Sequence, residues 1–142
     1  MTFGSMKYLL HVHQITIYLG VFSLIEAKQK AAVTLAGFPP EVVDQYIAFA
    51  ADGDPIRLDS VVLGVLQFHL PHPPSQPLSA MTGSTRLLED LGCDSLAMID
   101  MLFVAEEIFG VRLTDDELAR VTTLDDLLAH FRRHVVPGVP GV

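Results

Sequence analysis

The chain has 142 residues, of which 50% are hydrophobic and 18% charged, and its formal net charge is −8 at pH 7. Such an apolar composition excludes a disordered chain, and the negative charge excludes the basic surface that a nucleic-acid-binding protein needs. The single cysteine, Cys93, excludes an intrachain disulfide and a cysteine-based zinc site. It also fits a reducing compartment, so we expect a cytoplasmic protein.

The first 36 residues are the least regular part of the sequence. Residues 8–25 are eighteen consecutive residues without Lys, Arg, Asp or Glu. That is the lower length limit of a membrane span, but two histidines and a glutamine within it cost free energy in hydrocarbon. We therefore expect residues 1–36 to be an apolar N-terminal extension, helical or irregular, that packs on the rest of the protein or on a second chain. Membrane contact through residues 8–25 is the less favoured alternative.

Residues 37–70 carry the signals of two helices. A Pro-Pro-Glu run opens the first helix, and Asp52 followed by Gly53 closes it. Asp54 is suited to cap the second helix, with Pro55 as its first residue. Apolar residues then recur at helical spacing and predict one buried face. They are Ile56, Val62, Leu63, Leu66 and Leu70.

A loop separates these helices from the C-terminal half. Residues 71–84 hold four prolines and one glycine, and we expect Leu78 and Met81 to anchor the loop to the core. Residues 84–142 contain five arginines and eleven acidic residues, so most of the net negative charge belongs to this half.

Helical patterning returns over residues 85–136. It predicts a helix over 95–109 that stops at Gly110, and then a short helix capped by Thr114. A pair of threonines, with an acid three residues on, opens a last helix that ends in two arginines. We expect the tail, residues 137–142, to be flexible.

Ser95 lies at the N-terminus of the predicted helix over 95–109. The residues around it argue against a catalytic serine that is activated by a neighbouring base. The sequence lacks the G-x-S-x-G elbow of the α/β-hydrolases, and no His or Lys follows Ser95 before His130. Two interpretations remain. Ser95 is either a structural N-cap that accepts an orphan backbone N–H, or an attachment point. The second suits the position, because a phosphate ester at a helix N-terminus faces free N–H groups and the positive end of the helix dipole.

The same stretch resembles a known family, the acyl carrier proteins. The family's motif is an acid followed by Leu-Gly-x-Asp-Ser-Leu, which residues 90–96 match as D-L-G-C-D-S-L. The likeness extends over about residues 55–135, with 55–70 as the family's first helix. It implies that Ser95, between Asp94 and Leu96, carries covalent 4′-phosphopantetheine. A separate phosphopantetheinyl transferase would transfer this group from coenzyme A.

The resemblance also implies a fold and a role. The fold would be all-α, an up-down bundle of three longer helices and one short helix within a domain over 37–142, with its core motif over 84–136. The protein would not be an enzyme; it would carry acyl chains as thioesters for fatty-acid, polyketide or related lipid synthesis. Its partners would be the transferase and the acyl-transferring and chain-elongating enzymes, and a D-alanyl carrier stays open within the class. The alternative is a non-carrying, carrier-like interaction module in which Ser95 is a structural N-cap.

The helix over 95–109 has two stripes that bear on this role. One is mixed acidic and apolar, which suits docking on basic enzyme surfaces; the family uses equivalent positions for partner recognition. It consists of Leu96, Ile99, Asp100, Phe103, Glu106 and Glu107. The other is wholly apolar and consists of Met98, Leu102, Ala105 and Phe109. Ala97 and Ile108 stand where many carriers have acids, which would make the front less acidic.

We expect no metal site. The pairs His11-x-His13 and His69-x-x-His72 have ligand-like spacing, but nothing in the sequence supplies a convincing third ligand. Cys93 lies two residues before Ser95, and we interpret it as a packing residue.

Overall fold

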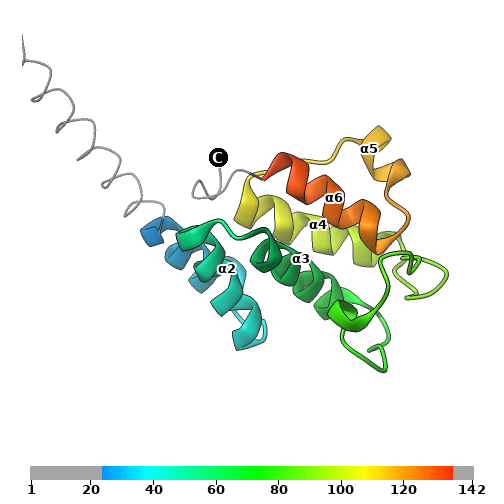
Figure 1. The fold of residues 1–142 in the computed structure, drawn as a ribbon, viewed down its shortest axis with the longest axis horizontal. Coiled ribbons are helices and arrows are strands. Elements are labelled where there is room, and N and C mark those ends of the chain that lie inside the picture. The colour runs from blue at the N-terminus through cyan, green and yellow to red at the C-terminus, as the bar shows by residue number, and fades with distance from the viewer. Residues whose placement is uncertain (1–23, 136–142) are drawn as a thin grey trace, which may run out of the picture.

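The computed structural model describes residues 24–135, and within that range the regular elements are all helical (Figure 1). Residues 24–34 are helical and lead into the other elements. In chain order these are α2 (Pro40–Asp52), α3 (Pro55–His69), the 3-10 helix η1 (Leu78–Ala80), α4 (Ser95–Phe109), α5 (Asp115–Arg120) and α6 (Leu124–His134). The predicted all-α bundle is confirmed: α3, α4 and α6 are its three longer helices and α5 its short one, and α2, which has 13 residues, packs on α3 as a further helix.

The expectations for the two ends of the chain fall largely outside these residues. The apolar stretch over 8–25 reaches the described part only at its last two positions, and the tail over 137–142 does not reach it. Between residues 24 and 135, none of the helices combines the length and the apolarity needed to cross a membrane.

Local capping explains where the helices begin and end. The Asp54 carboxylate accepts the Ile56 N–H at 2.9 Å and starts α3. Capping boxes open the last two helices, from Thr114 for α5 and from Thr123 for α6. Gly110 ends α4 in the left-handed region, with φ 68°, where a glycine has no Cβ to clash. These boundaries follow from side chains within a few residues of each helix end, so the sequence could predict them.

The core is organised around α3. This helix packs against α2, α4, α6 and η1. Of the residues predicted for its buried face, Val62, Leu63, Leu66 and Leu70 are buried, but Ile56 in the first turn is 71% exposed, so that part of the prediction is wrong. Leu78 of η1 is almost fully buried and Met81 packs against the same core, so the predicted anchoring of the loop is confirmed. Because α3 touches both the helix that begins with Ser95 and α6, it sets how those two helices lie against each other.

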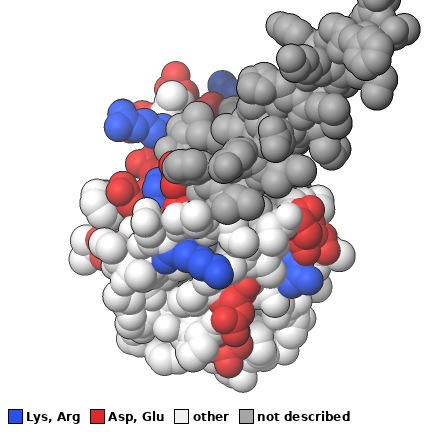
Figure 2. All heavy atoms as spheres, turned by 90° about the vertical axis from the view of Figure 1, so that its left-hand side faces the viewer, with Lys and Arg blue, Asp and Glu red and all other residues white. Residues whose placement is uncertain are grey.

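The end of the molecule formed by residues 24–52 shares this core. Ala27, Ala31 and Leu35 are buried in the same apolar cluster as α3 and α4. The Tyr46 hydroxyl donates to the backbone carbonyl of Ile108 at 2.9 Å and so ties α2 to the end of α4. Figure 2 faces this end, where the visible described surface is mainly uncharged and the few charged groups have both signs. The boundary between residues 36 and 37 stays a prediction.

Truncation tests that boundary. A chain that begins at residue 37 should keep its helical circular dichroism, because α2 to α6 remain. It should lose about 2–5 kcal/mol of unfolding free energy, the range for truncating one buried leucine. The reason is the loss of Leu35 and of the two buried alanines before it. A chain that begins at residue 24 keeps all three and is the matched control. If the shorter chain fails to fold, residues 24–36 are part of the domain and the boundary is wrong.

Candidate functional site

Ser95 is the first residue of α4, and its side chain is exposed. The preceding Asp94 has extended backbone angles, φ −79° and ψ −178°, and its carboxylate accepts the Ala97 N–H at 2.9 Å. Within residues 24–135 the Ser95 hydroxyl makes no hydrogen bond. Asp94 is therefore the N-cap of α4, and the interpretation of Ser95 as the cap is wrong.

The loop before Ser95 is held by backbone hydrogen bonds to the start of α6. The Leu87 N–H donates to the Thr122 carbonyl at 2.9 Å, and the Leu124 N–H donates to the Thr85 carbonyl at 3.0 Å. The Cys93 N–H then donates back to the Leu87 carbonyl at 2.8 Å. Leu87 and Cys93 are buried, so the loop is also anchored by packing. The position of Ser95 thus depends on contacts with residues about thirty positions later in the chain.

The acidic residue that opens the motif has a structural partner. Asp90 pairs with the Arg86 guanidinium at 3.0 Å and accepts the Arg86 backbone N–H at 2.8 Å. These hydrogen bonds, with the arginine side chain as the main cause, hold the pKa of Asp90 below its usual value. Asp90 is thus ionised at neutral pH and closes the turn that leads to Ser95.

A cavity of about 520 Å³ opens beside Ser95. Its walls are mostly apolar and come from the loop, from the first turns of α4, and from the α5 region. The lining residues are Leu87, Leu88, Glu89, Cys93, Asp94, Ser95, Met98, Ile99, Leu118, Val121 and Thr122. Burial, and then the charge of Asp94, raise the pKa of the Cys93 thiol to about 11. At neutral pH this thiol is protonated, which agrees with Cys93 as a packing residue.

The two stripes of α4 differ in exposure. The back stripe, Met98, Leu102, Ala105 and Phe109, is buried. On the front stripe Leu96, Ile99 and Phe103 have 67%, 58% and 70% of their surface exposed, and Asp100 and Glu107 are also exposed. Glu106 differs from these: it is half-buried, and its carboxylate accepts the Leu113 N–H at 3.3 Å. Glu106 therefore also fixes the loop after α4.

The structure corrects the placement of two further residues on this helix. Ala97 is 4% exposed and Ile108 is fully buried, so neither lies on the exposed front. Met101 is fully buried as well. The buried face of α4 is wider than one stripe because the helix packs against α3 and also receives α2 at its far end. A small or apolar residue at these two positions is what the core requires.

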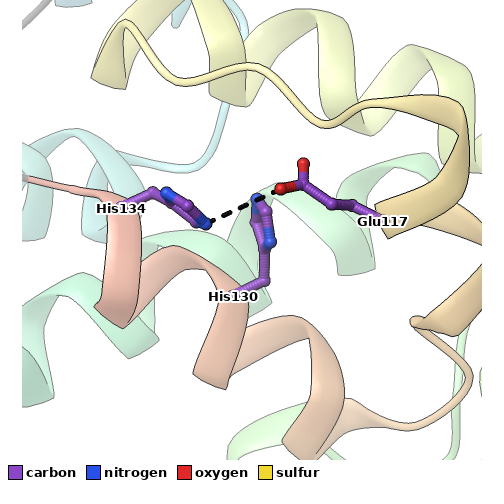
Figure 3. A group of neighbouring side chains, drawn as sticks. All are labelled: Glu117, His130 and His134. Atoms are coloured by element: carbon purple, nitrogen blue, oxygen red, sulfur yellow. Dashed lines mark ion pairs between the residues drawn. The ribbon is translucent and has the colours of Figure 1, made fainter.

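The histidine cluster in the structure is not one of the two pairs that the sequence analysis considered. His69 Nδ1 lies 2.9 Å from the Val65 carbonyl of its own helix, and His11 and His13 lie outside the described residues. Instead His130 and His134 of α6 lie beside Glu117 of α5 (Figure 3). The signal in the sequence was the spacing of four residues between the two histidines, which places both on one helix face.

Residues 75–131 match the family model described as a phosphopantetheine attachment site. The matched region begins in the loop before η1, contains the motif loop, α4 and α5, and ends inside α6. An all-α bundle with this match is a phosphopantetheine-bearing carrier domain, and its cofactor is covalent 4′-phosphopantetheine. An exposed serine beside an apolar cavity, with a hydroxyl that has no partner in the described part of the chain, fits that group.

The chain belongs to the acyl carrier protein family. It is 33% identical over 55 residues to the acyl carrier protein of Thermotoga maritima, covering 39% of this chain and 68% of that protein. It is 35% identical over 60 residues to that of Acidothermus cellulolyticus, covering 42% and 71%. The meromycolate extension acyl carrier protein of Mycobacterium tuberculosis is 25% identical over 79 residues, covering 56% and 68%. Two further acyl carrier proteins are covered over only 60% and 61% of their lengths. No solved structure matches the chain.

Two alanine variants test which of Asp94 and Ser95 caps the N-terminus of α4. Asp94→Ala should lower the free energy of unfolding by about 1 kcal/mol, because it removes the acceptor for the Ala97 N–H. Ser95→Ala should change it by less than about 0.5 kcal/mol, because the Ser95 side chain is exposed and has no hydrogen-bond partner among residues 24–135. Urea denaturation of both variants measures the difference. An equal loss in the two would mean that Ser95 also caps the helix.

Proposed function

We propose that this protein carries acyl intermediates as thioesters on a 4′-phosphopantetheine arm attached to Ser95. The observation that carries the proposal is the state of the Ser95 hydroxyl, which is exposed at the head of α4 and unpaired within the described residues. The thiol of the arm supplies the thioester chemistry. Because Asp94 already caps the helix, nothing in α4 requires a serine at position 95 for structure, and no observation favours the alternative of a non-carrying module.

The residues around Ser95 would bind and orient the arm. The first turn of a helix has backbone N–H groups without intrahelical partners, and Asp94 accepts that of Ala97. A phosphate at Ser95 would lie near the remaining N–H groups and the positive end of the α4 dipole. The motif loop, pinned to the start of α6, would keep this attachment point in one place for every partner.

The protein itself is proposed not to be an enzyme. The cavity beside Ser95 is lined by no histidine or lysine of residues 24–135, and of its two carboxylates, Glu89 and Asp94, the latter already accepts the Ala97 N–H as the helix cap. A separate phosphopantetheinyl transferase would therefore supply the base. The same cavity is apolar and about 520 Å³ in volume, and flexible Met98 lies in its wall, so it is suited to receive an acyl chain.

The exposed front of α4 is the proposed docking face. Leu96, Ile99 and Phe103 expose apolar surface there, and Asp100 and Glu107 add negative charge. Glu106 would contribute charge from a half-buried position. Apolar side chains interleaved with acids fit a partner with a basic, partly apolar groove, because charge steers the encounter and apolar contact holds it. The transferase and the acyl-transferring and chain-elongating enzymes are the proposed partners.

We propose that the carrier serves a pathway of lipid synthesis, without naming one pathway. Fatty-acid, polyketide and related lipid synthesis all use carriers of this kind, and a D-alanyl carrier is the other member of the class. One relative is named as an acyl carrier for meromycolate extension, which supports an acyl cargo. Cytoplasmic location is part of the proposal, and the single free cysteine agrees with it.

Mass spectrometry of the intact protein tests the attachment. After incubation with coenzyme A, Mg²⁺ and a promiscuous phosphopantetheinyl transferase, the mass should rise by one phosphopantetheine. Ser95→Ala should abolish the gain, because it removes the attacking oxygen, while Ser84→Ala, which changes an exposed serine at the start of the motif loop, should keep it. Modification that persists in Ser95→Ala would contradict the proposal.

Charge reversal tests the docking face. Asp100→Lys should weaken transferase binding by about tenfold at low ionic strength, where exposed charges are least screened, and by less at 0.5 M salt. Glu41→Lys makes the same change at an exposed position of α2 and is the control. Surface plasmon resonance over a salt series measures both, with circular dichroism to check folding. Equal affinity of Asp100→Lys and the unaltered protein at low salt would exclude docking through this face.

A further inference from the structure

We propose that Glu117, His130 and His134 bind one divalent transition-metal ion, of which Zn²⁺ fits best, between α5 and α6. Each residue offers one ligand atom, and the three atoms lie within 4.8 Å of one another. Figure 3 shows the His130 ring between the other two side chains, with a ring nitrogen turned toward the line that joins His134 to Glu117. The proposal is independent of what Ser95 carries.

Distances agree with a site that closes around an ion. The His134 Nε2 atom lies 4.0 Å from Glu117 Oε1, and the ring centroids of His130 and His134 are 4.5 Å apart. Ligand atoms at about 2.1 Å from a tetrahedral ion lie about 3.4 Å from one another. The partly exposed side chains of His134 and Glu117 need to move by only about 1 Å to reach that arrangement.

His130 is the observation that points to a ligand. It is 5% exposed, and its Nε2 atom is the one buried side-chain nitrogen or oxygen in residues 24–135 that lacks a hydrogen-bond partner. A buried polar atom without a partner costs free energy, so native proteins rarely leave one. A metal ion at this nitrogen would supply the missing partner.

Glu117 has one carboxylate oxygen available for the ion. Its Oε2 atom accepts the Thr114 N–H at 3.0 Å in the capping box of α5. Its Oε1 atom is the one that faces His134. The capping bond thus orients the carboxylate as outer-shell hydrogen bonds orient metal ligands elsewhere.

The chemistry of the donors selects the kind of ion. Two imidazoles and one carboxylate suit zinc and its neighbours in the first transition row, whereas Mg²⁺ and Ca²⁺ prefer oxygen ligands only. His130 and His134 lie in the last turn and a half of α6, where the negative end of the helix dipole favours a cation. The neighbouring Arg133 opposes it, and the carboxylate of Glu117 offsets that charge.

An ion at this place would hold α5 to the bundle. None of the residues of α5 is fully buried, and the apolar contact of this helix with the core is made by the partly buried Leu118. Leu118 of α5 lines the cavity beside Ser95 and directly follows Glu117. A bond between Glu117 and α6 through the ion would therefore also fix one wall of that cavity.

Isothermal titration and thermal unfolding of the full-length protein, first stripped with a chelator, test the site. Zn²⁺ should bind with one high-affinity site per chain, and an excess of about 100 Kd should raise Tm by roughly 5–10 °C. Glu117→Gln, which keeps a capping side chain, and His134→Ala, at a partly exposed position, should each weaken Zn²⁺ binding at least tenfold. The side-chain nitrogens of His130 and His134 should shift in nuclear magnetic resonance spectra of labelled protein when Zn²⁺ is added.

Controls separate this site from other places where the chain can hold a cation. His72→Ala, at an exposed residue outside the cluster, and the double variant His11→Ala/His13→Ala should keep the high-affinity Zn²⁺ site. Because the acidic surface attracts any divalent ion, Mg²⁺ at the same concentration is the control for non-specific binding, and it should raise Tm by less than Zn²⁺ does, since Mg²⁺ binds imidazole poorly. Unchanged affinity in His134→Ala, loss of the site in the His11/His13 variant, or an equal effect of Mg²⁺ would each overturn the proposal.

Discussion

The backbone pairing between residues 83–87 and residues 122–125 is the contact on which the geometry of the carrier site depends. Besides the two bonds at Leu87 and Leu124, the Asp125 N–H donates to the Gly83 carbonyl at 2.9 Å. The approach is so close that a Cβ at Gly83 would collide with the Asp125 carboxylate. This short pairing joins the motif loop to the start of α6. Because α5 directly precedes the paired residues, the pairing also holds α5 near the N-terminus of α4, where α5 forms one wall of the cavity.

Much of the fold was accessible from the sequence because the helix ends are specified locally. Asp54, Thr114 and Thr123 each satisfy backbone N–H groups within three residues, so their patterns needed no knowledge of the tertiary structure. The motif around Ser95 was also contiguous and carried the family resemblance. Local sequence did not settle which of Asp94 and Ser95 caps α4, because both side chains are suited to that position and only the backbone angles distinguish them.

Features that depend on long-range contacts were not accessible. Ala97 and Ile108 are buried because α4 packs on α3 and receives a hydrogen bond from α2, and helical periodicity alone does not indicate how wide a buried face is. Glu106 acts on the loop after its helix for a similar reason. The group of Glu117, His130 and His134 exists only because the turn after α5 brings the two helices together, and no motif of fixed spacing describes it.

The burial of Cys93 has a consequence for the stability of cargo on such a carrier. An acyl thioester exchanges readily with any nearby thiolate, and the sole cysteine of the chain lines the same cavity as Ser95. Exchange requires the thiolate form. With its pKa raised to about 11 and only 4% of its surface exposed, Cys93 presents almost none of that form at neutral pH. With the arm on Ser95 as proposed, a thiol two residues away would therefore not draw acyl groups off the arm.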